Sequence, residues 1–349
     1  MVNFNPIYNP KKIYKEMLKD IMSAKECICL ETYIFDKDKT GNRFLKAMVK
    51  KAKEGVKIKL FIDAWGSSAK REYFEELIKL GGEVKFFREF RYVIRIFSKN
   101  HERNHRKLLI IDNKIVYVGS ANITKNCLNW RELTLRMEGD IAKAFARSFF
   151  QSWETSGKIN KKRIKRLFHE GFEIIQDIPS PNSRQTEKEY IRLISKAKKE
   201  IIIETPYFVP SSAIRSAFSE AIKRKVNVKI MTPYISKPRI VDIVRTRYIG
   251  KIHETGIKIY YYPKMLHSKL LIIDNDFFLL GSSNLDYRSF MHQFEINLLG
   301  KDKEIIKKLR KNFNKTLKKC KPFNYNGWKK RSSLKKLLEL LLEFTRKYL

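Results

Sequence analysis

A repeated segment constrains this chain more than any other feature. His105–Asn122 reads HRKLLIIDNKIVYVGSAN, and His267–Asn284 reads HSKLLIIDNDFFLLGSSN. Two copies of one unit predict two similar domains. Six of the identical polar or glycine positions, all at a constant offset of 162 residues, stand out. Packing alone would keep the Leu/Ile pattern but would not require these polar and glycine positions to be identical. The pairs are His105/His267, Lys107/Lys269, Asp112/Asp274, Gly119/Gly281, Ser120/Ser282 and Asn122/Asn284.

The similarity extends towards the N-terminus with a larger offset. Glu31 and Glu204 are 173 residues apart, and Gly82 and Gly256 are 174 apart. The first copy therefore carries about 12 extra residues between Phe87 and His105, within REFRYVIRIFSKNHERN. This insertion is either a loop that faces the substrate or a plain surface insertion. We expect Glu31 and Glu204 to lie near the floor of a site or to pack at strand ends.

Short β-branched runs alternate with helical patterns in both copies, which predicts an α/β fold. Each domain is expected to contain a mixed β-sheet flanked by helices, and a pseudo-twofold axis is expected to relate the two. Predicted first-copy strands are Cys27–Ile34, Lys57–Ile62, Glu83–Phe87, Lys107–Ile111 and Ile115–Val118, and predicted helices are Lys11–Ser23, Arg43–Lys53 and Lys70–Leu80. Expected boundaries are 1–157 for the first domain, 158–168 for a basic linker, 169–326 for the second domain and 327–349 for a basic amphipathic helix.

The repeated segment predicts a hairpin that gathers polar groups. His105 and Lys107 share a strand face because they are two residues apart. A tight turn at Asp112-Asn113 would place His105 opposite Ser120, close to Asn122. The second copy brings together the same four residue types, at His267, Lys269, Ser282 and Asn284.

This set suits phosphodiester chemistry. Lysine, serine and asparagine side chains can bind phosphoryl oxygens, and histidine can act as a nucleophile or an acid/base catalyst. Displacement at phosphorus needs an attacking group and a leaving-group acid on opposite sides, so two copies would complete one site. The lysines supply the compensating charge, and neither a metal nor another cofactor is expected.

Net charge and hydropathy limit the class of binding partner and the location that the sequence allows. Lys+Arg 74 against Asp+Glu 37 gives a net charge of +37, which attracts anions such as lipid surfaces or nucleic acid. A charged fraction of 32% and no apolar run near 20 residues exclude a multi-span membrane protein. The N-terminus lacks the apolar core of a secretion signal. We expect a peripheral protein on the cytoplasmic side of the cell membrane.

The motif H-x-K-x4-D followed by G-S-x-N, present twice, resembles the phospholipase D superfamily. NWRELTLRMEG, ETPYFVP and GSSNLDYRSFMHQFEINL make the chain most similar to bacterial cardiolipin synthases. The resemblance implies a phosphatidyltransferase that condenses two phosphatidylglycerols to cardiolipin plus glycerol through a phosphohistidine. It also implies anionic phospholipid as substrate, without an obligatory protein partner.

The resemblance implies roles for individual residues. His105 would be the nucleophile and His267 the acid/base, although the near-symmetry leaves this order open. Glu132 and Glu295 would orient the histidines. Ser120, Asn122, Ser282 and Asn284 would bind the substrate phosphate, and the catalytic motifs also include Lys107, Asp112, Lys269 and Asp274. The two aspartates would lie at the far end of each hairpin, where setting the turn or a salt bridge is the better interpretation.

Two other functions remain open at this point. One is a metal-independent phosphodiesterase, nuclease or phospholipase D that uses the same two histidines on nucleic acid or lipid. The other is an inert binding module, which the intact polar sets in both copies argue against. The segment from Trp328 places leucines at helical spacing between basic residues, which predicts a helix on an anionic bilayer or one packed on the protein's own core.

Overall fold

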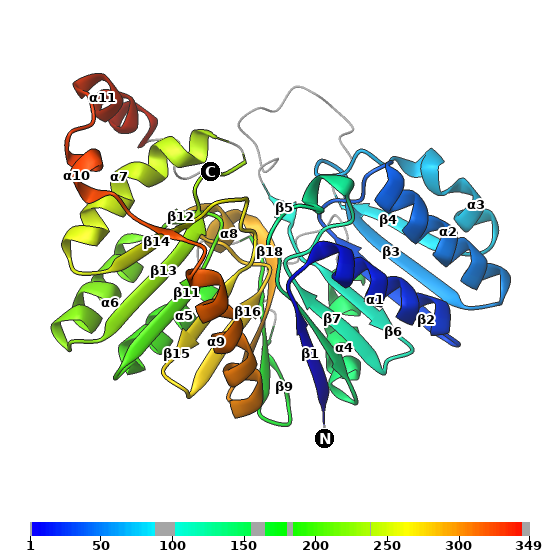
Figure 1. Ribbon diagram of the computed structural model, residues 1–349. Helices are drawn as coiled ribbons and strands as arrows, with labels where there is room; N and C mark the ends of the chain where they lie inside the picture. The colour runs from blue at the N-terminus through cyan, green and yellow to red at the C-terminus, as the bar shows by residue number, and fades with distance from the viewer. Residues whose placement is uncertain (1, 88–101, 155–164, 180–183, 238, 344–349) are drawn as a thin grey trace.

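The computed structural model describes residues 2–87, 102–154, 165–179, 184–237 and 239–343. Two large mixed sheets lie side by side, each with helices on its outer face (Figure 1). The predicted α/β fold class is confirmed. The insertion expected between Phe87 and His105 and most of the expected linker fall in residues 88–101 and 155–164, outside the described residues. The linker and the domain boundaries remain predictions.

The first sheet has the strand order β1-β8-β7-β6-β2-β3-β4. The pairs β2–β3 and β3–β4 are parallel and the remaining pairs are antiparallel. Its strands are β1 (Asn3–Ile7), β2 (Cys27–Thr32), β3 (Lys57–Asp63), β4 (Glu83–Phe87), β6 (Leu108–Ile111), β7 (Ile115–Gly119) and β8 (Thr134–Glu138).

The second sheet repeats this order as β10-β18-β16-β15-β11-β13-β14, with β9 and β19 added at its two ends. The sequence repeat therefore corresponds to a repeat of topology. Its strands are β9 (Leu167–His169), β10 (Phe172–Asp177), β11 (Glu200–Glu204), β13 (Asn227–Pro233), β14 (Lys258–Tyr262), β15 (Leu270–Ile273), β16 (Phe277–Gly281), β18 (Gln293–Gly300) and β19 (Lys321–Pro322). A small additional sheet pairs β12 (Phe208–Val209) with β17 (Leu285–Asp286).

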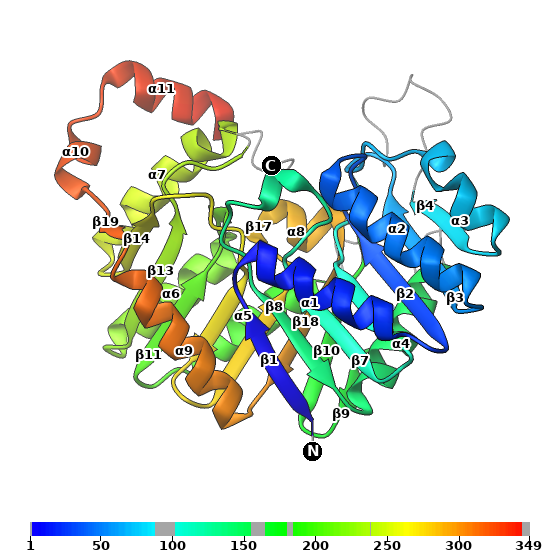
Figure 2. The same ribbon diagram turned by 45° about the vertical axis from the view of Figure 1, so that its right-hand side comes forward.

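The helices cover both faces of each sheet. α1, α2 and α3 lie outside the first sheet, and α6 and α7 lie outside the second (Figures 1 and 2). The helices are α1 (Pro10–Ser23), α2 (Lys39–Lys53), α3 (Glu75–Lys79), α4 (Ile141–Glu154), α5 (Gln185–Lys196), α6 (Ser212–Lys223), α7 (Ile240–Glu254), α8 (Tyr287–His292), α9 (Lys303–Leu317), α10 (Tyr325–Lys329) and α11 (Ser333–Leu341).

Local chemistry explains where the structure departs from the expected helices. α2 begins one turn before Arg43 because Asp38 caps it, accepting a bond from the Thr40 amide at 2.7 Å. The helix expected over Lys70–Leu80 is a 3₁₀ turn, Arg71–Phe74, followed by the short α3. The single helix expected over 327–349 is divided into α10 and α11.

The interior joins the two halves. One hydrophobic cluster lies under α1 and α2 in the first half, and another lies under the outer helices of the second. A third cluster contains buried side chains from both halves, including Ile110 and Phe145 with Ile272 and Leu309. The short strand β5 (Arg103–Asn104) belongs to the first half but pairs in parallel with β18 of the second sheet. The two sheets are thus held in one fixed relationship.

Candidate active site

His105 lies three residues before β6 and is held by the other half of the chain. Its backbone amide donates to the carbonyl of Phe294 at 3.0 Å. Its ring Nδ1 lies 3.0 Å from Oε1 of Glu295, the next residue on β18. The backbone contact and the ring contact together fix the position of this imidazole.

His267 has the equivalent arrangement in the other half of the chain. Its amide donates to the carbonyl of Arg131 at 2.7 Å, and its Nδ1 lies 2.9 Å from Oε2 of Glu132. Both glutamates expected to orient histidines therefore contact them, and each contacts the histidine of the opposite half. Carboxylate acceptors at Nδ1 place the ring proton there and leave Nε2 available for chemistry.

The two serines make a contact that differs from the expected one. The hydroxyl of Ser120 donates to Glu132, and that of Ser282 donates to Glu295. Both serines are fully buried. Since a hydroxyl has one proton to donate, each serine holds its glutamate in this arrangement. Direct binding of a substrate phosphate by Ser120 and Ser282 remains a prediction.

Glycine is required beside each serine. A Cβ at Gly119 would lie 2.2 Å from the carbonyl oxygen of Leu133 on the chain leading into β8. A Cβ at Gly281 would lie 2.3 Å from the carbonyl oxygen of Ile296 on β18. Only glycine lets the hairpin approach the neighbouring strand closely enough for the serine to reach its glutamate.

Lys107 and Lys269 lie beside the histidines, as expected. The ammonium of each donates to the carbonyl of its own histidine, at 2.5 Å for Lys107 and 2.6 Å for Lys269. Burial lowers the pKa of Lys107 to about 7 and that of Lys269 to about 8, although the nearby glutamates act in the opposite direction. These buried ammonium groups are the cations available to an anionic substrate.

The electrostatics of the centre keep the rings neutral. Burial, and then the charges of Lys107, Lys269 and His267, hold the pKa of His105 well below its usual value. Burial lowers the pKa of His267 to about 4, with Glu132 opposing the shift. Lys107 and Lys269 act on both imidazoles, which therefore lie in one electrostatic environment. A bound phosphate anion would raise both pKa values.

Asn122 and Asn284 follow the repeated hairpins and are both buried. Each has a buried Oδ1 without a hydrogen-bond partner among the described residues. The backbone around Asn122 is fixed, because the Tyr14 hydroxyl donates to its carbonyl at 2.7 Å. The backbone amide of Asn284 donates to the Ser289 hydroxyl at 3.1 Å. Their side-chain amides therefore remain candidates to bind a phosphate oxygen.

The two motif aspartates lie at the opposite end of the hairpins. Both occupy left-handed backbone positions in the turns, with φ of 52° for Asp112 and 50° for Asp274. Each carboxylate accepts bonds from three successive backbone amides of the adjoining segment. The donors are Lys25, Glu26 and Cys27 for Asp112, and Lys198, Lys199 and Glu200 for Asp274. This placement matches a role in holding the turn.

Glu31 and Glu204 are both fully buried and paired with arginines. Glu31 Oε2 lies 3.1 Å from Nε of Arg106, and Arg131 donates to Glu204 at 2.7 Å. Arg131 also supplies the carbonyl that binds the His267 amide. These ion pairs support the segments that hold the two histidines.

Sequence reasoning missed the aromatic groups around the centre. Tyr33 packs edge-on against His105 with ring centroids 5.0 Å apart, and Trp130 packs against His267 at 5.3 Å. Trp65 lies near the guanidinium groups of Arg103 and Arg288, at 4.6 Å and 5.7 Å from the ring centroid. The sequence segments WRE and DYR contain Trp130 and Arg288, but only the placement of the two halves reveals these contacts.

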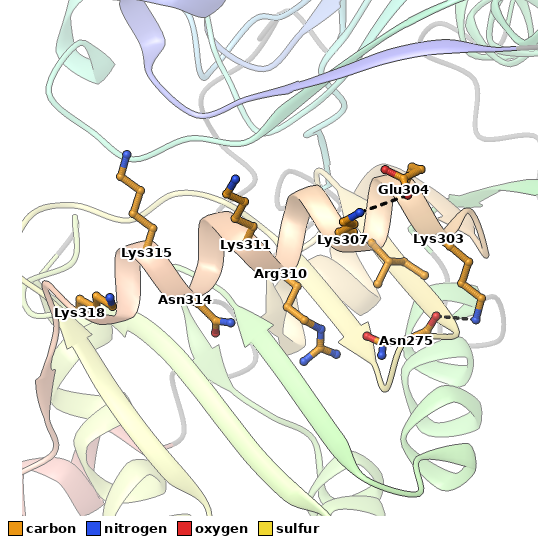
Figure 3. Close-up of a pocket in the computed structure, with 10 residues that line it drawn as sticks. Asn275, Lys303, Glu304, Lys307, Arg310, Lys311, Asn314, Lys315 and Lys318 are labelled. Atoms are coloured by element: carbon orange, nitrogen blue, oxygen red, sulfur yellow. Dashed lines mark hydrogen bonds and ion pairs between the residues drawn. The ribbon is translucent and has the colours of Figure 1, made fainter.

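A basic pocket on α9 is separate from the histidine centre. Its volume is about 720 Å³, and Figure 3 shows Lys311 and Lys315 projecting from the helix. Arg310 in the same pocket is bonded to Glu200 and to the carbonyl of Asp274. None of the histidines or their glutamates lines this pocket. It adds to the positive field of the molecule without taking part in the centre.

Comparison with known proteins gives consistent results. Residues 17–153 and 190–317 match the family described as "Cardiolipin synthase, PLD-like domain". The chain is 32% identical to a cardiolipin synthase from Clostridium perfringens, with 96% of this chain and 74% of that protein covered. It is 33% identical to one from Listeria welshimeri, with 91% and 70% covered.

Solved structures show the same fold. The phosphatidylserine synthase of Haemophilus influenzae superposes with a TM-score of 0.78 at 14% sequence identity, covering 99% of this chain and 95% of that one. The polyphosphate kinase of Porphyromonas gingivalis gives a TM-score of 0.64 at 12% identity, covering 100% of this chain and 53% of that one. At these identities the likeness concerns the fold alone.

Proposed function

Since this chain belongs to the phospholipase D-like cardiolipin synthase family, we propose that it condenses two phosphatidylglycerols to cardiolipin and free glycerol. The observation that carries the mechanism is the crossed pairing of His105 with Glu295 and of His267 with Glu132. A single half of the chain supplies a histidine without its orienting carboxylate. The two halves together supply two oriented imidazoles and two buried ammonium groups.

In the first step, the neutral Nε2 of His105 attacks the phosphorus of phosphatidylglycerol. A nitrogen–phosphorus bond forms while the bond from phosphorus to the glycerol oxygen breaks. His267, protonated in the presence of the anionic substrate, gives its Nε2 proton to the departing glycerol. Lys107, Lys269 and the two asparagine amides stabilise the negative charge on the non-bridging oxygens.

In the second step, a hydroxyl of another phosphatidylglycerol attacks the phosphohistidine. His267 is now neutral and accepts the hydroxyl proton, so it ends the cycle as it began. The nitrogen–phosphorus bond breaks and His105 returns to its neutral form. Water entering in place of the second lipid would give phosphatidic acid. Exclusion of water therefore decides between transfer and hydrolysis.

The same reasoning supports a peripheral location on an anionic membrane. Among the described residues, the helices are too short or too polar to cross a bilayer. A net charge of +37 favours binding to anionic phospholipid, and the cytoplasmic leaflet is the anionic one in many cells. We place the protein at that surface, where its lipid substrate is available.

The test is an assay with purified protein and phosphatidylglycerol vesicles in the presence of EDTA. We expect cardiolipin and glycerol in equal amounts, with no loss of rate after metal removal. Parallel reactions contain single-stranded or double-stranded DNA. Cleavage of DNA without cardiolipin formation would overturn the proposal in favour of a nuclease with the same two histidines. Phosphatidic acid as the sole lipid product would indicate hydrolysis.

A further inference from the structure

The helix α11 has its amphipathic faces reversed relative to an ordinary surface helix. Within α11, all of whose residues are described, the buried side chain is Glu339, which is 4% exposed. The leucines face outward, so they do not pack on the protein's own core, which was one of the two arrangements expected for this segment. Their exposed fractions are 75% for Leu334, 51% for Leu337, 42% for Leu338, 55% for Leu340 and 56% for Leu341.

Polar contacts fix this orientation. The guanidinium of Arg331 donates to both carboxylate oxygens of Glu339, at 2.8 Å and 3.0 Å, and stacks over Trp328 at 4.0 Å. Trp328 in turn donates from its indole to the carbonyl of Thr246 on α7 at 2.9 Å. A bidentate, largely buried ion pair has a defined geometry, so α11 cannot turn its leucines inward without breaking it.

A second attachment lies just beyond the end of α11. Glu343 accepts a bond from the Tyr248 hydroxyl at 2.7 Å and lies 2.8 Å from Arg247, both on α7. The acidic groups of this segment are thus turned toward the protein. Lysines remain exposed on and beside the helix, at Lys329, Lys330, Lys335 and Lys336. The outer surface therefore combines leucines with positive charge.

More exposed apolar side chains lie at the start of α7. Tyr234 is 61% exposed, Ile235 is 47% exposed and Ile240 is 37% exposed. A cavity of about 540 Å³ between α7, α10 and α11 has Ile243 and Leu338 among its walls. Tyr261, also in its wall, packs against Tyr234 with ring centroids 5.7 Å apart. Leu338 of α11 and a neighbour of Tyr234 thus line one cavity, and exposed apolar side chains grouped in this way indicate an interaction site.

This surface lies at the same end of the second sheet as the active site. Tyr234 and Ile235 follow β13, which runs parallel to β11. The hydroxyl of Tyr207, near the end of β11, donates to the carbonyl of Lys237 in the same loop. Burial raises the pKa of Tyr207, and the charges of Asp286 and Tyr33 raise it further. Tyr33 itself packs against His105, with ring centroids 5.0 Å apart. α11 and α8 both lie on the upper side in Figures 1 and 2.

We propose that the leucines of α11, together with Tyr234, Ile235 and Ile240, dock this protein on an anionic phospholipid bilayer. Leucines would enter the acyl boundary while the lysines contact the headgroups. The inference rests on the proposed function in one respect: docking by this surface brings the histidine centre to its lipid substrate. The ion pair of Arg331 and Glu339 is the device that keeps the leucines directed at the membrane.

The experiment compares the full chain with a variant that carries Leu334→Gln, Leu337→Gln and Leu341→Gln. Glutamine keeps the helix propensity close to that of leucine. The control carries Leu80→Gln and Phe168→Gln, two exposed apolar residues on other elements. Each protein is floated with phosphatidylglycerol vesicles and with phosphatidylcholine vesicles. Activity is measured on vesicles and on short-chain phosphatidylglycerol below its critical micelle concentration.

We expect the α11 variant to lose at least tenfold in binding and turnover on phosphatidylglycerol vesicles. Its turnover of the monomeric lipid should stay within twofold of the wild type, and the control should match the wild type throughout. Replacing Lys329, Lys330, Lys335 and Lys336 with serine should remove the preference for anionic vesicles.

Vesicle binding by the α11 variant equal to that of the wild type would overturn the inference. So would a wild-type dimer that becomes monomeric in the variant, because the surface would then join two copies of the chain. If neither the wild type nor the variants turn over monomeric phosphatidylglycerol, the proposed function fails. The flotation experiment would still test the docking inference independently.

Discussion

The ring of His105 is hydrogen-bonded to Glu295, a residue 190 positions further along the chain. Its counterpart, His267, is hydrogen-bonded to Glu132, 135 positions earlier. The repeat thus creates two histidine–glutamate pairs, each of which draws one member from either half. This crossed arrangement makes distinct predictions for the two glutamates, although their sequence contexts are similar.

Glu295→Gln and Glu132→Gln should each lower kcat by roughly 10²–10⁴-fold, because an amide cannot stabilise a charged imidazole as a carboxylate does. The phosphatidylglycerol assay measures this loss. Glu138→Gln on β8, an exposed position in the described structure, is the control and should leave the rate unchanged. Wild-type rates in both glutamate variants would contradict the orienting role.

The pairing predicts which step each variant loses. With a phosphatidyl ester of p-nitrophenol, the leaving group departs without a proton, so only the nucleophile is needed for the first step. His105→Ala and Glu295→Gln should release no p-nitrophenol burst. His267→Ala and Glu132→Gln should retain the burst while failing to form cardiolipin. The burst amplitude is read by absorbance.

His169→Ala, at a histidine on β9, serves as the control for that experiment and should behave as the wild type. If Glu132→Gln instead lost the burst together with His105→Ala, the functional pairing would follow the sequence halves. A burst lost in His267→Ala but retained in His105→Ala would reverse the assignment of nucleophile and acid/base.

The lysine charges predict an alkaline limit to substrate binding. With pKa values of about 7 and 8, Lys107 and Lys269 are both charged in acid and lose their protons as the pH rises. An anionic lipid favours the protonated lysines, so binding above pH 8 requires proton uptake. KM should rise by up to about tenfold per pH unit for each proton taken up.

Steady-state kinetics on monomeric phosphatidylglycerol between pH 6 and 10 would measure this dependence. Lys269→Arg keeps its charge throughout the range and should show a shallower increase in KM, whatever its kcat. A KM that stays constant from pH 6 to 10 in the wild type would show that the ammonium charges do not govern binding.

Asp112→Asn should reduce stability more than catalysis. The carboxylate accepts bonds from the amides of Lys25, Glu26 and Cys27, and an asparagine NH₂ group would face those donors. Partial exposure limits the cost to about 1–2 kcal/mol of unfolding free energy. Urea unfolding would measure it, with Asp276→Asn in the second hairpin as the exposed control.

The same aspartate predicts an acid dependence. Burial acts to raise the pKa of Asp112, but the three amide bonds outweigh it and lower the pKa overall. Its contribution to stability is therefore present above the pKa of an unfolded aspartate and is lost as the pH falls through the folded pKa. The difference between wild type and Asp112→Asn should shrink in strong acid, and a constant difference would argue against this account.

Much of the fold could be predicted from the repeat and from strand periodicity. The predicted turn at Asp112-Asn113 places His105 opposite Ser120, and the structure pairs Leu108 with Val118 and Ile111 with Ile115, a register shifted by one residue. Equal strand order in the two sheets follows from the same repetition. These features depend on neighbours in sequence, which the residue pattern records directly.

Contacts between the halves could not be predicted in the same way. Glu132 and Glu295 were expected to orient histidines, but which glutamate meets which histidine depends on how two sheets pack. The contacts of Ser120 with Glu132 and of Ser282 with Glu295 could not be predicted for a related reason, because the sequence does not show which carboxylate lies next to each hydroxyl. From the sequence alone, a serine beside a glycine could bind a phosphate or hydrogen-bond to a carboxylate, and only the structure shows that a carboxylate lies next to it.

The hydrophobic cluster shared by Ile110, Phe145, Ile272 and Leu309 has a consequence for the evolution of this chain. After duplication, the outward surfaces of the two copies were free to diverge, as the unequal strand additions at β9 and β19 illustrate. A substitution at the common seam must satisfy both copies at once. Separately expressed halves would each leave that seam in water, so recovery of activity on mixing them would require reassembly of the entire interior.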